Sequence, residues 1–189
     1  MQEYERQWVT AAIINKDRKY FGYLVKEHQS TVRGYLRRLT KGNSALSDDL
    51  AQETFLIAFR KISTFKGSGS FKGWLLAIAY RIFLGHIRKN SSNPLMNFPD
   101  RAFNEEEIID PTQARITKNI SDKIDIGKAI IKLKKNERSA LTLCYTYGMS
   151  HSEISNVMDM PLGTVKSHIA RGKEALKALL TPAKEDELC

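Results

Sequence analysis

The stretch that decides the fold is residues 148–171, which read GMSHSEISNVMDMPLGTVKSHIAR. Ser150 and Glu153 have the spacing of a capping box, in which two side chains satisfy free N–H groups at the start of a helix. Apolar residues then recur at helical steps as far as Met158, and Pro161 closes a short turn. A second amphipathic run follows the proline. The stretch therefore predicts two short helices joined by a tight turn.

The second of these helices has a basic outer face that is rich in hydroxyl groups. That face carries Thr164, Lys166, Ser167, His168, Ala170, Arg171 and Lys173. A capped helix, a turn and a basic second helix are the arrangement of a helix-turn-helix, whose second helix enters the major groove of DNA. Lys166 and Arg171 can donate to guanine edges, and Thr164 and Ser167 are placed for phosphate contact. An ordinary antiparallel helix pair with a solvated charged face is the alternative.

The rest of the chain has the same helical character. One apolar stripe at steps of three and four residues consists of Phe21, Leu24, Val25, His28, Val32, Tyr35, Leu36 and Leu39. Residues 42–44 (GNS) interrupt it, and Ser47 can cap a second helix with Asp48 and Asp49 in its first turn. Asn136 can cap another helix in the last third of the chain. Because no useful strand-like alternation appears in the first half, we predict an all-α fold of two small helical domains.

Both ends of the chain are basic and the middle is acidic. Net charges of +9, −3 and +3 fall on residues 1–89, 90–126 and 127–189. This distribution favours two modules that bind a polyanion. Proline and asparagine breaks, together with the run Glu105-Glu106-Glu107, indicate a linker between them. We expect domains at residues 1–89 and 124–181, a flexible acidic linker at 90–123 and a tail at 182–189.

Several function classes are disfavoured by composition. No apolar run approaches the ~18 residues of a membrane span, and the opening MQEYERQWVT is polar. Cys144 and Cys189 have no ligand spacing, so we expect two free thiols in a reducing cytoplasm. The histidines form no metal motif, and no nucleophile–base pattern is visible. We therefore expect a cytoplasmic protein that is not an enzyme and needs no metal, cofactor or small-molecule substrate.

A glycine-rich stretch, FKGSGSFKGW, spans residues 65–74 and predicts a loop. It follows no strand and lacks the terminal Gly-Lys-Ser/Thr, so it is not a nucleotide-binding P-loop. Its aromatic and basic flanks can trap an unstacked base and hold the nucleic-acid backbone. Phe65 can equally be a residue of the hydrophobic core, and for Phe71 and Trp74 a place in the core is the favoured role.

An acidic cluster of Asp48, Asp49, Gln52 and Glu53 lies just before this loop. Paired carboxylates can bind a metal or transfer protons, but no histidine or cysteine joins them at ligand spacing. A protein-binding face is the better interpretation, and a solvated helix face is the simple alternative.

Two ordered motifs carry a family resemblance. Residues 49–55 (DLAQETF) and 65–79 (FKGSGSFKGWLLAIA), followed by Arg88, resemble conserved region two of bacterial sigma factors. Residues 148–155 (GMSHSEIS) and 161–171 (PLGTVKSHIAR) resemble their region four. The likeness covers roughly residues 10–89 and 124–180, with little between them. The chain is therefore similar to the small extracytoplasmic-function (ECF) group, which lacks the first and third domains.

The resemblance implies a subunit that directs RNA polymerase to promoters. It implies docking of one helix face on the clamp coiled coil of the largest polymerase subunit, by Asp48, Asp49, Gln52, Glu53, Leu56 and Arg60. It implies melting and reading of the −10 element by Phe65, Lys66, Ser68, Ser70, Phe71, Lys72, Trp74, Arg81, Arg88 and Lys89. It implies reading of the −35 duplex by Thr164, Lys166, Ser167, His168, Arg171 and Lys173. The flap of the second-largest subunit and an inhibitory anti-sigma protein are further implied partners.

Two other hypotheses belong to different classes. A one-component helix-turn-helix regulator would use residues 1–89 as a dimerising or ligand-binding module and would bind a palindromic operator without polymerase. A nucleic-acid enzyme such as a resolvase-like recombinase would need a nucleophile and an acidic or arginine constellation, which the sequence does not display.

Overall fold

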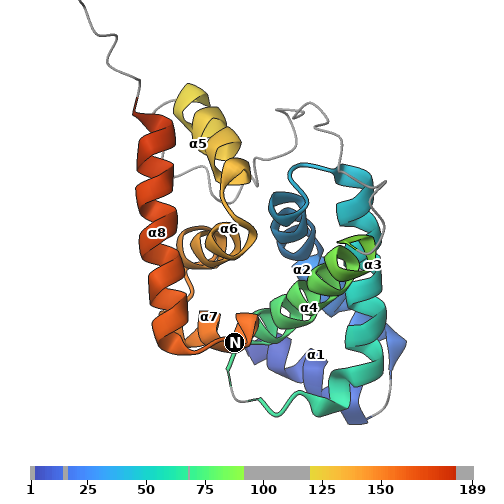
Figure 1. Ribbon diagram of the computed structural model, residues 1–189. Helices are drawn as coiled ribbons and strands as arrows, with labels where there is room; N and C mark the ends of the chain where they lie inside the picture. The colour runs from blue at the N-terminus through green and yellow to red at the C-terminus, as the bar shows by residue number, and fades with distance from the viewer. Residues whose placement is uncertain (1–2, 15–16, 68, 92–119, 182–189) are drawn as a thin grey trace, which may run out of the picture.

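The computed structural model describes residues 3–14, 17–67, 69–91 and 120–181 (Figure 1). These residues contain helices and no strand, which confirms the predicted all-α fold. The first half forms α1 (Glu3–Ile14), α2 (Arg18–Leu39), α3 (Ser44–Lys61), the 3₁₀ turn η1 (Ile62–Thr64) and α4 (Phe71–Ser91). The second half forms α5 (Ile120–Lys132), α6 (Lys135–Leu141), the π-helical turn η4 (Thr142–Thr146), α7 (His151–Met158) and α8 (Leu162–Leu180).

Helices α1 to α4 form the N-terminal bundle. The predicted stripe on α2 faces its core, where Leu24, Tyr35 and Leu36 are almost completely buried. Helix α1 closes one side through a buried hydrogen bond of 2.8 Å between His28 Nε2 and Glu5 Oε1. His28 is thus a buried histidine whose ring has a hydrogen-bond partner.

Helices α5 to α8 form the C-terminal bundle, which contains the helix-turn-helix. Both bonds of the predicted capping box are present, because Ser150 Oγ accepts from the Glu153 N–H and Glu153 accepts from the Ser150 N–H. Asp159 ends α7 in the left-handed region, with φ of 53°. Val165 and Ile169 then bury the inner face of α8. The local signals in the sequence therefore predicted this motif correctly.

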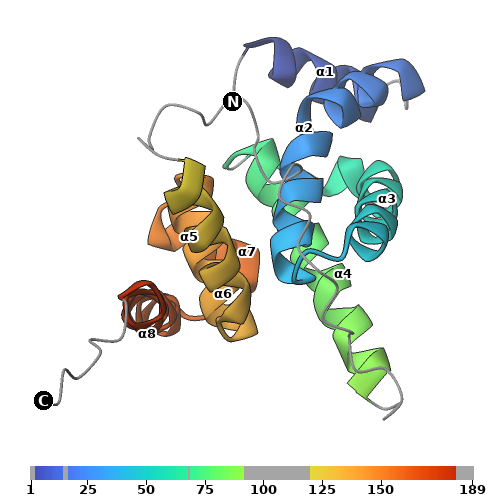
Figure 2. The same cartoon turned by 90° about the horizontal axis from the view of Figure 1, so that it is seen from above.

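The two bundles lie side by side and are in contact. Helix α7 packs against α4, and α6 packs against α2. Figures 1 and 2 both place α8 on the side of the C-terminal bundle that faces away from α1 to α4. Helix α4 is thus packed from both bundles, and every residue from Leu75 to Tyr80 is buried.

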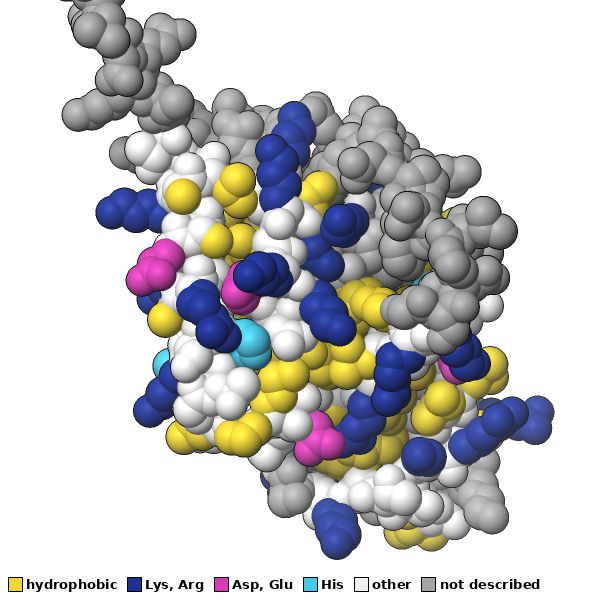
Figure 3. All heavy atoms as spheres, viewed as in Figure 1, with side chains coloured by type: hydrophobic (Ala, Val, Ile, Leu, Met, Phe, Trp, Pro, Cys, Tyr) yellow, Lys and Arg dark blue, Asp and Glu magenta, His cyan; other side chains and the backbone are white. Residues whose placement is uncertain are grey.

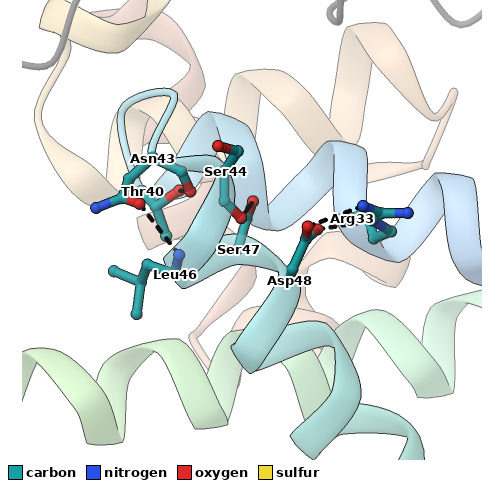
Figure 4. Close-up of polar contacts among 7 residues, drawn as sticks. All are labelled: Arg33, Thr40, Asn43, Ser44, Leu46, Ser47 and Asp48. Carbon is teal, nitrogen blue, oxygen red and sulfur yellow. Dashed lines mark hydrogen bonds and ion pairs between the residues drawn. The ribbon is translucent and has the colours of Figure 1, made fainter.

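Two predicted helix caps are wrong. Helix α3 begins at Ser44, and its cap is Asn43, whose side chain accepts from the Leu46 N–H at 3.1 Å (Figure 4). Ser47 lies inside the helix, where its buried hydroxyl donates to the Ser44 carbonyl at 2.8 Å. Asn43 takes the cap because the chain leaves α2 through a left-handed Gly42, with φ of 84°.

The second misplaced cap is at α6. Lys134 occupies the cap position there and makes no side-chain cap bond. Asn136 lies in the first turn, and its Oδ1 accepts from the Tyr80 hydroxyl of the other bundle at 3.3 Å. A tertiary contact therefore uses the side chain that the sequence assigned to a local role.

Some sequence-based expectations lie outside the described residues. These are the acidic run Glu105-Glu106-Glu107, most of the expected linker, the C-terminal tail and the thiol of Cys189. Helix α5 begins at Ile120, within the range expected for the linker. Cys144 is a half-buried free thiol. In the part of the chain that is described, no helix combines the length and the apolar character that crossing a membrane requires.

Gly172 is a packing point between α8 and α6. A Cβ at this position would lie 2.8 Å from Leu141 Cδ1 and 3.3 Å from Glu137 Cβ. Gly172→Ala should therefore lower the free energy of unfolding by about 1–2 kcal/mol through overpacking, although alanine favours helix. Urea unfolding followed by circular dichroism measures the effect. Gly163→Ala on the same helix meets nothing within 4 Å, so it should be neutral or slightly stabilising; equal losses in both variants would contradict the packing.

Candidate functional site

A groove of about 820 Å³ runs between α2 and α3. The exposed face of α3 forms one edge and presents Asp49, Gln52, Glu53, Leu56 and Arg60 to solvent. Leu56 is 60% exposed, which is unusual for a leucine in the middle of an 18-residue helix. The floor of the groove is apolar, with Phe21, Val25 and Phe55 among its lining residues. An apolar floor beneath a polar rim is typical of a protein-docking surface.

Asp48, the first residue of the acidic cluster on α3, forms an ion pair with Arg33. Its carboxylate accepts two hydrogen bonds from the Arg33 guanidinium, at 2.7 Å from Nε and 2.9 Å from Nη2 (Figure 4). This fork ties α2 to α3 across the groove, and its two opposite charges compensate each other. Arg33 and Arg18, which also lines the groove, were not identified from the sequence, because only the packing of α2 on α3 brings them to this site.

The three aromatic residues of the glycine-rich stretch 65–74 pack against one another in a cluster. Phe65 and Phe71 are buried, and Trp74 is half-buried. The three ring centroids lie 5.4–5.7 Å apart. In this conformation Phe65 and Phe71 present no face to solvent, so the core role that competed for them is the one that the structure displays. Their packing holds the loop at a fixed place on the bundle.

The loop formed by the glycine-rich stretch is shorter than its glycines suggest. Helix α4 begins at Phe71, and Ser70 Oγ accepts from the Gly73 N–H at 3.0 Å as its cap. Only residues 65–70 therefore lie outside regular helix, and Ser68 lies outside the described residues. Lys66 is exposed on this loop.

A second groove of about 560 Å³ lies between α3 and α4. Trp74, Ile78 and Ile82 give it an apolar side. Arg81 and Lys89, both predicted from the sequence, reach it from α4. Lys61 and His86 also line it, and neither was identified from the sequence, because their place depends on how α3 and α4 cross. Glu53 of α3 also lines the groove, but it is outnumbered by Lys61, Arg81 and Lys89. A ring, an apolar wall and an excess of cations along one groove suit a nucleic-acid strand.

The remaining two cations of this set have different surroundings. Arg88 is exposed in the last turn of α4. Lys72 is half-buried, and its Nζ donates to the Tyr147 carbonyl of the C-terminal bundle at 3.3 Å. Lys72 is therefore engaged between the bundles.

Helix α8 presents the predicted recognition face to solvent. Thr164, Lys166, Ser167, Arg171 and Lys173 are exposed, and His168 is half-buried. The hydroxyl of Ser167 donates to the Gly163 carbonyl at 2.9 Å, so it has only acceptor capacity left. The face thus has the orientation that a helix needs in order to enter a major groove.

Arg171 is held by two neighbours on this face. Its Nη2 donates to His168 Nδ1 at 3.1 Å, and its Nε lies 3.7 Å from Glu137 Oε1. Burial, and then the adjacent Arg171, lower the pKa of His168. The ring is therefore neutral at neutral pH and accepts from the guanidinium. These contacts pre-position Arg171, which reduces the entropy lost when it binds a ligand.

Lys173 lies next along the helix, where its Nζ is 5.3 Å from the centroid of the exposed Tyr145 ring. The face viewed in Figure 3 has dark blue Lys and Arg side chains over both bundles and few acidic ones. The positive charge predicted from composition therefore gathers on a shared surface.

Two helical bundles, one with a basic groove and one with an exposed recognition helix, define a two-module nucleic-acid-binding protein. Residues 24–93 match the family model described as Sigma-70 region 2, and residues 123–176 match Sigma-70 region 4. The chain is 34% identical over 164 residues to the ECF RNA polymerase sigma factor SigC of Mycobacterium tuberculosis, covering 87% of this chain and 83% of that one. It is 30% identical to the RNA polymerase sigma-H factor of Pseudomonas aeruginosa, covering 96% of both. The chain belongs to the ECF-type RNA polymerase sigma factors.

Solved structures share its fold. The sigma factor RpoE of Bartonella quintana, solved with the anti-sigma factor NepR, superposes with a TM-score of 0.70 at 22% identity, covering 88% of this chain and 99% of that one. CnrH, solved with the cytosolic domain of CnrY, gives 0.63 at 20% identity, covering 94% and 97%.

The cap of α7 gives a prediction about pH. Hydrogen bonds from the Ser150 backbone and hydroxyl lower the pKa of Glu153. A lowered pKa in the folded state stabilises the fold above the unfolded pKa, and this stability is lost as pH falls through the folded pKa. Glu153→Ala should therefore cost about 1 kcal/mol at neutral pH and less at acid pH.

Urea unfolding at neutral and acid pH measures this difference. Glu174→Ala removes an exposed carboxylate from α8 and is the control, since it removes no cap. A loss for Glu153→Ala that is the same at both pH values would contradict the role of the charged cap.

Proposed function

We propose that this sigma factor binds core RNA polymerase through α3 and reads two promoter elements, one with each bundle. The observation that carries the proposal is the joint presence of three surfaces on one chain. These are the α2–α3 groove with its exposed Leu56, the basic α3–α4 groove, and the outward face of α8. A duplex reader alone would need only the last of them.

The α3 face is proposed to dock on the clamp coiled coil of the largest polymerase subunit. Its exposed leucine, glutamine and acidic groups offer an apolar anchor with a polar rim, which is the usual composition of a docking surface. The Arg33–Asp48 fork holds α2 and α3 in register beneath it. The flap of the second-largest subunit is the proposed partner of the C-terminal bundle.

The α3–α4 groove is proposed to receive the opened −10 element. Trp74 offers a half-exposed ring for stacking, and Arg81, Lys89 and Lys61 surround the groove with positive charge. Stacking and backbone contacts of this kind offset the few kcal/mol needed to unstack a base. Phe65 and Phe71 support the loop from below in this scheme.

Helix α8 is proposed to read the −35 element as duplex. Lys166 and Arg171 are assigned to base edges, and Thr164 to a phosphate near the start of the helix. Ser167 is assigned to a neighbouring phosphate, which requires its hydroxyl to give up its bond to the Gly163 carbonyl. His168 positions Arg171, and Lys173 extends the contact along the backbone. Because both readers are tethered to one polymerase, the spacing between the elements becomes part of the recognised signal.

Further expectations follow from the family. Sigma factors are not enzymes, and we propose that this chain has no catalytic activity and acts in the cytoplasm with RNA polymerase. An anti-sigma protein is the proposed inhibitor, supported by the similar folds solved with such partners. The one-component regulator is not favoured, because the chain matches both sigma regions.

Reconstitution tests the function directly. The purified chain is added to core RNA polymerase with a library of genomic promoters, and transcripts are mapped. Initiation from a discrete promoter set, dependent on the chain, is expected. Specific binding to a palindromic site with no initiation at any promoter would overturn the proposal.

The docking face gives one quantitative prediction. Gln52→Lys with Glu53→Lys places two cations on a surface proposed to complement the polymerase clamp, so affinity for core enzyme should fall about tenfold or more. Fluorescence anisotropy with labelled protein measures it. Glu3→Lys with Gln7→Lys adds the same charge to exposed positions on α1 and is the matched control. An equal loss in the control would refute the assignment to α3.

The recognition helix gives another prediction. Lys166→Ala with Arg171→Ala should remove base contacts of ~1–3 kcal/mol each from recognition of the upstream element. If either residue instead contacts phosphate, the slope of log affinity against log salt falls by about 0.9 for that contact. Footprinting and salt titration of the polymerase complex distinguish these cases. Lys177→Ala, near the end of the same helix, should change little; an unaltered upstream footprint in the double variant would contradict the model.

A further inference from the structure

A buried polar pair lies next to the aromatic cluster of the glycine-rich stretch. Glu5 on α1 and His28 on α2 are both buried, and a hydrogen bond of 2.8 Å joins His28 Nε2 to Glu5 Oε1. The centroid of the His28 ring also lies 5.5 Å from that of Phe71, the completely buried first residue of α4. The pair therefore connects α1 to the aromatic cluster.

Phe71 in turn contacts the ring that faces the α3–α4 groove. Phe71 stacks on Trp74, with ring centroids 5.4 Å apart and planes inclined by 30°. Trp74 is the half-exposed member of the cluster, and it lines the groove. The Trp74 N–H donates to the Ser70 carbonyl at 3.1 Å, which fixes the backbone at this point. The orientation of the Trp74 ring is then set by the rings that pack on it.

Helix α1 supports the glycine-rich loop at both ends. It packs on η1, the turn that ends just before Phe65. Through Glu5 and His28 it also reaches Phe71, where the loop ends and α4 begins. The match to Sigma-70 region 2 begins at residue 24, so α1 lies outside the matched segment. The partner of His28 therefore comes from a helix to which the family match assigns no role.

A hydrogen-bonded pair fixes a ring more sharply than apolar packing does. An apolar side chain in place of His28 could turn within the core, whereas the bond to Glu5 requires one orientation of the imidazole ring. Because both groups are buried, loss of one leaves the other without a partner. Removal of Glu5 therefore releases the His28 ring from its fixed place beside Phe71.

We propose that α1 is a brace for opening of the −10 element, with Glu5 and His28 as its positioning residues. Glu5 orients His28, His28 holds Phe71, and Phe71 keeps the Trp74 ring where an unpaired base can stack on it. A ring that is already in place loses less entropy when it binds. The effect on promoter opening rests on the proposed function, whereas the brace itself rests on the contacts of Glu5, His28 and Phe71.

Variants of the full chain separate positioning from stability. Glu5→Ala removes the partner of His28, and His28→Phe removes the same bond from the other side while it keeps a ring against Phe71. Glu5→Gln retains a side chain that can bond to either tautomer of the imidazole, so it is the conservative rescue. Val9→Ala, one turn further along α1, removes buried apolar atoms and leaves the pair in place, so it is the matched control. Urea unfolding verifies that each variant is folded under the assay conditions.

Fluorescence of Trp74 measures the place of its ring. The chain has two tryptophans, Trp8 and Trp74, so every variant is made in a Trp8→Phe background. Glu5→Ala and His28→Phe should shift the emission to longer wavelength and increase quenching by acrylamide, because the Trp74 ring is held less firmly against Phe71. Glu5→Gln and Val9→Ala should emit as the background chain does.

Promoter opening is then measured with core RNA polymerase, on a promoter mapped by the reconstitution described above. Glu5→Ala should slow formation of the open complex about tenfold, because a misplaced stacking ring captures the unpaired base poorly. Affinity for core enzyme and the footprint over the −35 element should be unchanged, since neither surface contains the pair. Glu5→Gln should restore most of the rate, and Val9→Ala should retain it.

Three results would overturn the brace. They are unchanged Trp74 emission in both Glu5→Ala and His28→Phe, a defect in Glu5→Gln as large as that in Glu5→Ala, and equal slowing of promoter opening by Val9→Ala. Emission that shifts in Glu5→Ala and returns in Glu5→Gln, in a chain that opens no promoter with core polymerase, would confirm the brace and refute the proposed function. Normal opening by a Glu5→Ala chain whose emission has shifted would refute the stacking role of Trp74.

Discussion

Burial of α4 on two opposite sides is the constraint on which the rest of the structure depends. From Leu75 to Tyr80 every residue is buried, which is more than one bundle can achieve for a surface helix. One side packs on α2 and α3 and the other on α7. The same helix therefore completes the core of the N-terminal bundle and forms much of the contact with the C-terminal one. Its remaining side, with Arg81 and Lys89, lines the basic groove.

The packing of α4 against both bundles explains why a groove and an exposed helix face, two different kinds of binding surface, coexist on a small chain. Apolar residues on α4 are occupied by packing, so the groove between α3 and α4 retains only a narrow apolar wall beneath cations. On α8 the division is simpler, because Val165 and Ile169 face inward and the basic groups face solvent. The groove between α3 and α4 suits a single strand of opened DNA, and the face of α8 suits an intact duplex.

The contact between the bundles includes buried polar groups as well as apolar ones. Tyr35 belongs to the apolar stripe of α2 and yet bonds to Ser139, which lies 104 residues away in the chain. Arg138 is buried with carbonyls as its acceptors. Apolar packing would hold the bundles together without any penalty for a buried charge, whereas the carbonyls that accept from Arg138 offset part of its desolvation cost.

The sequence by itself determined the elements whose signals are local. The capping box of α7, the turn after it, the inward stripe of α8 and the basic outward face could all be predicted, because helical periodicity and caps involve residues within a few positions of one another. The all-α class followed from the same periodicity. The exposed residues of α3 were identified in the same way.

Tertiary structure decided everything that joins distant segments. It made Asn43 the cap of α3 in place of Ser47, turned Asn136 toward Tyr80, and buried Phe65 and Phe71. It brought Lys61 and His86 into the groove with Arg81, and Arg33 to Asp48. These outcomes depend on crossing angles and on contacts between residues far apart in the chain, and a local pattern contains no information about either.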